Sequence, residues 1–168
     1  AFWLEDYSLY MACKTHFGNQ EWPLWDKDIK FRTSEAVAKY SQLLKEDMEF
    51  WKFCQYKFYG QWEKLRRYAN ERGISLIGDV PIYMALDSAD VWVNPDLFQL
   101  DENLTPIKVA GVPPDAFSDD GQLWGNPLYD WDAMDAEDFE WWSRRIGAAS
   151  VLYDVVRFDH FIGVTQYY

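Results

Sequence analysis

The order of hydrophobic and polar residues along this 168-residue chain predicts helices first and strands later. In residues 2–17 apolar side chains recur at three- and four-residue steps, which is typical of an amphipathic helix, and Gly18 follows as a stop. Residues 21–31 combine a proline with tryptophans and aspartates, and we expect a loop there.

A second helical pattern is too long for one ordinary helix. It begins at Ser34, which we expect to be the N-cap, and it continues to Gly73, where a left-handed glycine would end it. We predict a bend or break within it, either near residues 46–47 or near Gly60.

Two short apolar runs, residues 74–80 and 154–159, are typical of buried parallel strands. Between them we expect a small hairpin at residues 98–109, an irregular stretch at 110–131 and a helix at 137–153. The irregular stretch contains three prolines and three glycines, and loops of this length are usually functional or disordered. Its large apolar residues argue against disorder.

The order of strand and helix predicts βαβ topology, with parallel strands and an α/β fold class. In parallel sheets and barrels the functional site lies beyond the C-terminal ends of the strands. Asp79 and Asp159 end the two predicted strands, so we expect two carboxylates at equivalent positions.

The second predicted strand ends in Arg157, Asp159 and His160. Side chains alternate along a strand, so Arg157 and Asp159 point to the same side, where the guanidinium favours the ionised carboxylate. Such a carboxylate suits a glycosidase nucleophile, and His160 can donate a hydrogen bond to a sugar hydroxyl. The pattern alone is short, and a structural ion pair, a strand-end cap and a structural histidine stay open as explanations.

Composition narrows the partners that we expect. The net charge of −12 argues against nucleic acids and anionic membrane surfaces, and no run of about 18 apolar residues predicts a membrane span. Cys13 and Cys54 show no metal or disulfide spacing, so a reduced cytoplasmic setting is expected. Aromatic residues make up 19% of the chain, with 10 tryptophans, which suits a rich core or a carbohydrate site.

Three motifs are more specific than these patterns. In chain order they are LIGDVPIYMALDSADVWVNPDLF, VAGVPPDAFSDDGQLWGNPLYDW and VVRFDHFIG. Together they resemble the amylomaltase-type 4-α-glucanotransferases, or disproportionating enzymes, of glycoside hydrolase family 77. The earlier segments FWLEDYSLYMACK and QYKFYGQWEKLRRYANERGI fit the same family, so the resemblance covers essentially the whole chain.

The resemblance implies site residues. It implies Asp159 as the catalytic nucleophile and Arg157 as the arginine that holds it ionised. The implied sugar-binding residues are Asp79 and His160 at the strand ends, Trp124 and Asn126 at the donor subsites, and Asp115 and Phe117 in a loop over the substrate. Ala116 stands where family members often have tyrosine, so one aromatic acceptor contact is not implied. The implied substrates are α-1,4-glucan oligosaccharides (maltodextrins), with no metal or other cofactor.

The implied fold is a partial (β/α)8 TIM barrel with helical insertions, with about two barrel strands in this chain. We expect residues 1–168 to form an incomplete part of one catalytic domain, without an internal boundary. Retaining chemistry needs two carboxyl groups about 5 Å apart, and the family's acid/base glutamate is implied beyond Tyr168. The chain begins without methionine, and we expect it to be a piece of a longer enzyme that is inactive alone.

Two other classes of protein stay open. A hydrolytic α-amylase also has an Arg-x-Asp strand end, although GVPPD and QLWGNPLYDW are not known as its motifs. A non-catalytic carbohydrate-binding module would suit the tryptophan content. Such modules are mostly β-sandwiches, whereas this chain is predicted to be largely helical.

Overall fold

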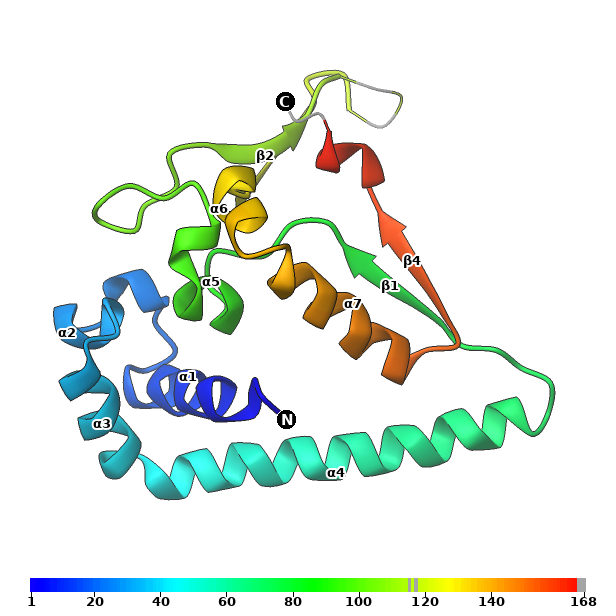
Figure 1. Ribbon diagram of the computed structural model, residues 1–168, viewed down its shortest axis with the longest axis horizontal. Helices are drawn as coiled ribbons and strands as arrows, with labels where there is room; N and C mark the ends of the chain where they lie inside the picture. The colour runs from blue at the N-terminus through cyan, green and yellow to red at the C-terminus, as the bar shows by residue number, and fades with distance from the viewer. Residues whose placement is uncertain (115, 117, 166–168) are drawn as a thin grey trace. The chain divides into compact units, whose positions relative to one another are not determined.

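The computed structural model describes residues 1–114, 116 and 118–165 (Figure 1). Contacts between Cα atoms divide the chain into two compact units, residues 1–61 with 87–94 and residues 62–86 with 95–168. Two such units can belong to one domain, so the predicted absence of a domain boundary stays a prediction. Among the described residues, no helix combines the length and the apolar character that a membrane crossing requires.

The first unit is helical. Its elements are α1 (Leu4–His16), the 3-10 helix η1 (Trp22–Leu24), α2 (Lys27–Lys30), α3 (Ser34–Leu43), the beginning of α4 (Lys45–Asn70) and α5 (Ala89–Val93). Helix α1 confirms the helix predicted at residues 2–17, and Gly18 follows it with a φ of +65°. The loop predicted at residues 21–31 is partly wrong, because Pro23 suits a first helical turn and both η1 and α2 form there.

The long helical pattern is interrupted between α3 and α4. Thr33, not Ser34, is the N-cap of α3, because its hydroxyl accepts a hydrogen bond from the Ala36 amide at 3.2 Å. The interruption lies at Leu44, near the first predicted position, and the alternative break at Gly60 is wrong. One glycine costs a helix only about 1 kcal/mol, which the other residues of α4 can offset.

Aromatic side chains form the core of the first unit. The ring centroids of Tyr10, Trp25 and Trp92 lie between 5.5 and 5.7 Å from one another, and all three residues are buried. The Trp92 indole N–H donates to the Ile29 carbonyl at 3.1 Å, so its one polar atom is satisfied inside this core. This unit therefore uses part of the high aromatic content for packing.

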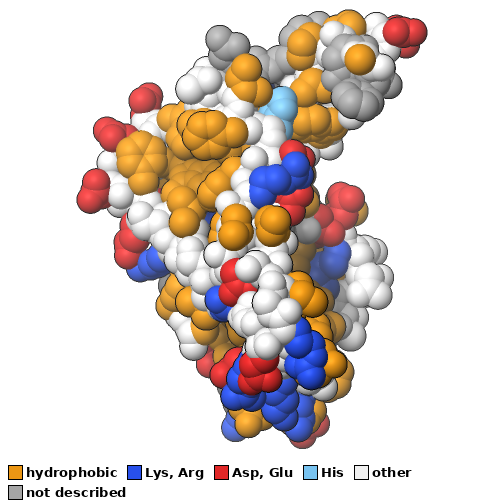
Figure 2. Space-filling model, turned by 90° about the vertical axis from the view of Figure 1, so that its right-hand side faces the viewer, with side chains coloured by type: hydrophobic (Ala, Val, Ile, Leu, Met, Phe, Trp, Pro, Cys, Tyr) orange, Lys and Arg blue, Asp and Glu red, His pale blue; other side chains and the backbone are white. Residues whose placement is uncertain are grey.

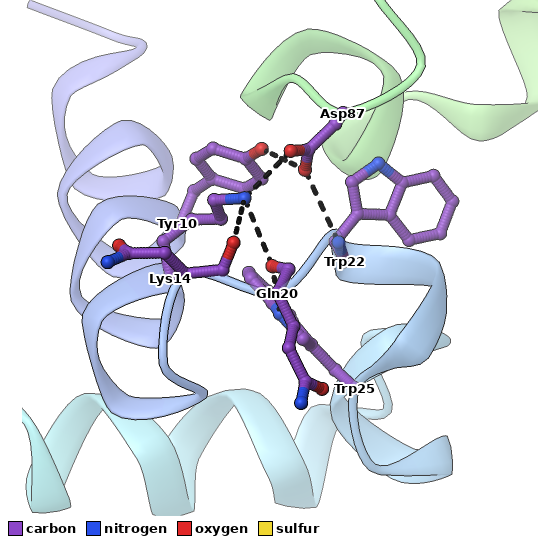
Figure 3. Close-up of polar contacts among 7 residues, drawn as sticks. Tyr10, Lys14, Gln20, Trp22, Trp25 and Asp87 are labelled. Atoms are coloured by element: carbon purple, nitrogen blue, oxygen red, sulfur yellow. Dashed lines mark hydrogen bonds and ion pairs between the residues drawn. The ribbon is translucent and has the colours of Figure 1, made fainter.

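A carboxylate, Asp87, lies at the edge of this aromatic core (Figure 3). It accepts hydrogen bonds from the Tyr10 hydroxyl at 2.7 Å and from the Trp22 amide at 3.3 Å, and it pairs with the Lys14 ammonium at 2.7 Å. Burial alone would raise the pKa of Asp87, but the bonds from Lys14 and Tyr10 outweigh it and hold the pKa below its usual value. Asp87 thus joins α1 to the segment that precedes α5.

Replacing Asp87 with asparagine is expected to lower the free energy of unfolding by about 1–3 kcal/mol, because an amide nitrogen would face donors that now meet an oxygen. Lys14 would keep its bonds to the Asn19 and Gln20 carbonyls but lose its anionic partner. Urea denaturation of the full-length protein measures the change. In a double-mutant cycle with Lys14→Met the two losses should overlap, and strictly additive losses would contradict the pairing.

The second unit contains two small sheets and their helices. Its elements are the end of α4, β1 (Ile77–Pro81), the 3-10 helix η2 (Pro95–Leu97), β2 (Val109–Val112), β3 (Gln122–Pro127), α6 (Trp131–Ala136), α7 (Glu140–Leu152), β4 (Val155–Asp159) and the 3-10 helix η3 (Phe161–Val164). Strands β1 and β4 pair in parallel, which confirms the predicted βαβ topology and the α/β class. Within the described residues these two strands form a sheet of their own, so a barrel is not closed.

The second sheet lies in the stretch that was predicted to be irregular. Strands β2 and β3 pair antiparallel within residues 109–127, so the prediction is wrong for these strands. Glycine permits the pairing, because a Cβ added to Gly111 would lie 2.5 Å from the Gln122 carbonyl oxygen. Where a hairpin was predicted at residues 98–109, the structure has an isolated antiparallel bridge between Leu100 and Pro106.

The turn between α7 and β4 is fixed by Asp154. Its carboxylate accepts hydrogen bonds from the Leu76 amide at 2.8 Å and from the Asn70 side chain at 2.7 Å. The other carboxylate oxygen accepts from Arg66 Nε at 2.9 Å. These donors, the Leu76 amide foremost, lower the pKa of Asp154 to about 2. Asp154 therefore links the start of the parallel sheet to α4.

Replacing Asp154 with asparagine is expected to destabilise the full-length protein in a pH-dependent manner. The folded-state pKa lies below the unfolded value, so the carboxylate stabilises the fold above about pH 4 and this contribution is lost as the pH falls towards 2. Urea midpoints of the wild type and Asp154→Asn should therefore differ at pH 7 and converge as the pH falls towards 2. A difference that is independent of pH would contradict the assignment.

Candidate functional site

One face of the β1–β4 sheet carries the predicted charged residues. The residues of this face are exposed and pair across the two strands: Ile77 with Val155, Asp79 with Arg157, and Pro81 with Asp159. The opposite face lies against α7, which runs beside both strands (Figure 1), and there the rings of Phe158 and Trp142 are 6.4 Å apart. Strand alternation therefore directs Arg157 and Asp159 to the side away from α7.

Arg157 joins the two strand-end carboxylates. Its Nε donates to Asp79 Oδ1 at 2.9 Å and its Nη2 donates to Asp79 Oδ2 at 2.5 Å. The same Nη2 lies 3.4 Å from Asp159 Oδ1. The guanidinium thus forms a bidentate pair with Asp79, and Asp159 is a second, more distant anionic neighbour. Sequence reasoning placed Arg157 beside Asp159 and did not foresee the bidentate pair with Asp79.

The ionisation of Asp79 limits the chemistry of this group. Hydrogen bonds from Arg157 hold the pKa of Asp79 below its usual value, against a smaller opposing effect of desolvation. The same pair raises the pKa of Arg157. Asp79 is therefore an anion at neutral pH and cannot supply a proton to a leaving group.

Aromatic residues flank the strand end. The Trp124 ring lies 5.0 Å from the His160 imidazole in an edge-to-face arrangement, and Trp124 remains 39% exposed. Its indole N–H donates to Gln122 Oε1 at 3.0 Å, a contact within β3. His160 follows β4 with a φ of +50°, in the left-handed region that costs energy for a residue other than glycine.

The other predicted sugar-binding residues have different outcomes. Asn126 donates from its side-chain amide to the Met84 carbonyl at 2.9 Å, so this side chain links β3 to the segment after β1. Its predicted contact with a sugar stays a prediction. The predictions for Asp115 and Phe117 lie outside the described residues. The structure thus brings together the charged residues Asp79, Arg157 and Asp159, and it brings the ring of Trp124 beside that of His160. In both cases the residues come from segments that are distant in sequence.

Sequence reasoning missed Tyr83. This residue lies two positions after the end of β1, and its ring centroid is 6.2 Å from Trp124 and 6.3 Å from His160. An aromatic residue directly after a strand that ends in a candidate site residue was the available signal. Among the described residues, no group of three or more His, Cys, Asp or Glu side chains could hold a metal ion.

Hydrophobic groups remain exposed around these residues. The space-filling view shows a broad area of hydrophobic side chains beside a histidine and neighbouring acidic and basic groups (Figure 2). Exposed large apolar residues of the second unit include Ile77, Val155, Leu123, Phe161 and Ile162. An anion held by a guanidinium, next to aromatic faces, can orient a sugar ring and present a nucleophile to it.

Known proteins are similar to this chain in sequence. The family profile described as 4-alpha-glucanotransferase matches residues 1–168. The 4-alpha-glucanotransferase of Clostridium butyricum is 54% identical over 167 residues, which make up 99% of this chain and 34% of that protein. The 4-alpha-glucanotransferase of Aquifex aeolicus is 52% identical over 168 residues, which make up 100% of this chain and 34% of that protein.

A solved structure agrees with the sequence matches. It is the amylomaltase from Streptococcus agalactiae in complex with acarbose, which superposes with a TM-score of 0.94 at 49% identity over 98% of this chain and 34% of that chain. This chain therefore spans about one third of the length of these relatives. Family profile, sequence identity and superposition agree, and the chain belongs to the 4-alpha-glucanotransferase family.

Proposed function

We propose that the complete enzyme containing this chain transfers α-1,4-glucan segments between maltodextrins, with Asp159 as its nucleophile. The observation that carries the proposal is the position of Asp159. It ends β4 on the open face of the sheet, 3.4 Å from the guanidinium that holds Asp79. Family membership and the acarbose bound to a relative, an oligosaccharide analogue, support a glucan substrate.

The proposed mechanism is a retaining double displacement. A carboxylate oxygen of Asp159 attacks the anomeric carbon, and the bond to the leaving glycosidic oxygen breaks as that oxygen takes a proton from a glutamic acid outside this chain. The 4-hydroxyl of another glucan then gives its proton to the same glutamate and displaces the aspartyl ester. Arg157 restrains the nucleophile, and the ionised Asp79 is available to accept hydrogen bonds from sugar hydroxyls.

Transfer instead of hydrolysis requires that water stays away from the glucosyl-aspartate. Trp124 and His160 lie at the strand end and, on this proposal, cover the sugar with their rings. The β2–β3 hairpin, which carries Trp124, then forms part of the donor subsites. A cytoplasmic setting is part of the proposal and is supported by the free thiols of Cys13 and Cys54.

Product analysis tests the proposal. The complete enzyme, or a chimera in which residues 1–168 replace the matching third of the Clostridium butyricum relative, is incubated with maltotriose. Transfer yields glucose together with maltodextrins longer than the substrate. Products that are exclusively shorter than maltotriose would show a hydrolase and contradict the proposal. Residues 1–168 alone serve as the control and are expected to be inactive, because the proton donor is outside them.

A further inference from the structure

Tyr83 occupies a central place that the proposed mechanism leaves without a role. Its side chain is only 6% exposed, although it lies in the short segment just after β1. Its ring stacks on that of Tyr129, with centroids 6.1 Å apart and an angle of 25° between the planes. The residue is thus fixed on one side by packing in the second unit.

The backbone that leads into Tyr83 is fixed as well. The Tyr129 hydroxyl donates to the Ile82 carbonyl at 2.5 Å. From α7, Arg145 donates to the Pro81 carbonyl at 2.5 Å and to the Ile82 carbonyl at 3.3 Å. Two side chains therefore hold the two carbonyls that precede Tyr83, and the direction of its side chain is set from α7 and from the segment after β3.

The other side of Tyr83 faces the site. Its ring lies within 6.3 Å of the rings of both Trp124 and His160, measured between centroids. Its hydroxyl donates to the Gly163 carbonyl at 3.4 Å, in the turn that follows β4. The approach is close, because a Cβ added to Gly163 would lie 2.8 Å from the Tyr83 hydroxyl oxygen.

We infer that Tyr83 is a positioning residue for the sugar site: its ring fixes the orientation of Trp124 and His160. This inference rests on the proposed function. Trp124 is 39% exposed and its ring contacts the rings of Tyr83 and His160, and His160 has a strained backbone. Without the Tyr83 ring, both side chains would gain rotational freedom that binding a sugar would have to remove.

This role predicts a change in binding more than in chemistry. In the complete enzyme, Tyr83→Leu is expected to raise KM for maltotriose and Kd for acarbose about tenfold, with kcat changed less than about twofold. Tyr83→Phe keeps the ring and should stay within about threefold of the wild type in KM, because it loses only one long hydrogen bond. Equal effects of the two variants would contradict a role for the ring.

Tyr40 offers a matched control. It is 4% exposed, and its hydroxyl donates to Asp26 at 3.0 Å in the first unit. Tyr40→Leu should lower Tm as Tyr83→Leu does but leave KM unchanged. If both variants lower Tm and neither changes KM or acarbose binding, Tyr83 is a packing residue and the inference is wrong.

A double-mutant cycle tests the coupling to Trp124. In a Trp124→Ala background, Tyr83→Leu should raise KM clearly less than in the wild type, because the side chain that it orients is already absent. An equal rise in KM in both backgrounds would overturn the inference. The proposed function would still hold in that case, provided that the wild type transfers maltotriose. A wild-type enzyme that neither transfers maltotriose nor binds acarbose would overturn both.

Discussion

Replacing Asp159 with asparagine in the complete enzyme is expected to lower kcat for maltotriose disproportionation by about 10⁴-fold or more, as expected for removal of a catalytic nucleophile. The amide has nearly the same shape but cannot form the glucosyl ester. The Asp159 side chain is 64% exposed, so its loss should change Tm little, and acarbose binding should remain within a few-fold of the wild type. Activity is measured by glucose release and by the longer products.

A smaller side chain gives a sharper test of the same residue. In Asp159→Gly, azide can enter the vacated space and attack an α-maltosyl fluoride donor. Fluoride leaves and a maltosyl azide of inverted anomeric configuration forms. Glu102→Gln, in an exposed turn of the second unit, serves as the control for loss of one charge and should behave as the wild type. Transfer by Asp159→Asn above a few per cent of the wild-type rate would exclude Asp159 as the nucleophile.

The strands and their parallel pairing could be predicted because each strand is a short apolar run that follows a helical pattern. Their predicted burial is wrong for one face in this chain, because Ile77, Val155 and the charged residues of the same face are exposed. The pairing of individual residues could not be predicted. Sequence reasoning aligned Asp79 with Asp159 as two strand ends, whereas the register places Asp79 opposite Arg157 and Pro81 opposite Asp159. This two-residue difference depends on the packing of both strands, and it gives Arg157 two carboxylate neighbours.

The β2–β3 hairpin could not be predicted from local pattern. Its glycines and prolines disfavour strands locally. The two strands nevertheless pair across the intervening residues, so contacts between distant residues override the local propensity of the sequence. The N-cap of α3 differs from the predicted residue for another reason. Thr33 and Ser34 are both good caps, and side-chain type alone does not choose between neighbours. The contacts of Tyr83 likewise depend on the placement of β3 and β4, which no local signal contains.

Replacing Arg157 with methionine is expected to lower kcat/KM for maltotriose by about 10²–10³-fold, as for the loss of one preorganised charged group. Lysine should restore part of the activity, because it returns the charge without the planar fork that holds Asp79. Without the guanidinium, the pKa of Asp79 rises from its lowered value. The acid limb of the kcat/KM profile should therefore move to higher pH in Arg157→Met. Arg144→Met, on the exposed side of α7, is the control and should keep the wild-type profile.

A comparison with Asp79→Asn decides what Arg157 does. If Arg157 serves only as the structural partner of Asp79, removing either residue breaks the same pair and the two variants should lose similar activity. If Arg157 also restrains Asp159, Arg157→Met should be the more damaging variant, and it should stay damaging when combined with Asp79→Asn. The 3.4 Å separation between Arg157 Nη2 and Asp159 Oδ1 favours the second outcome, because the cation is already within ion-pair distance of the nucleophile. Equal losses in the two single variants, with no further loss in the double variant, would reduce Arg157 to an ion-pair partner at the strand end.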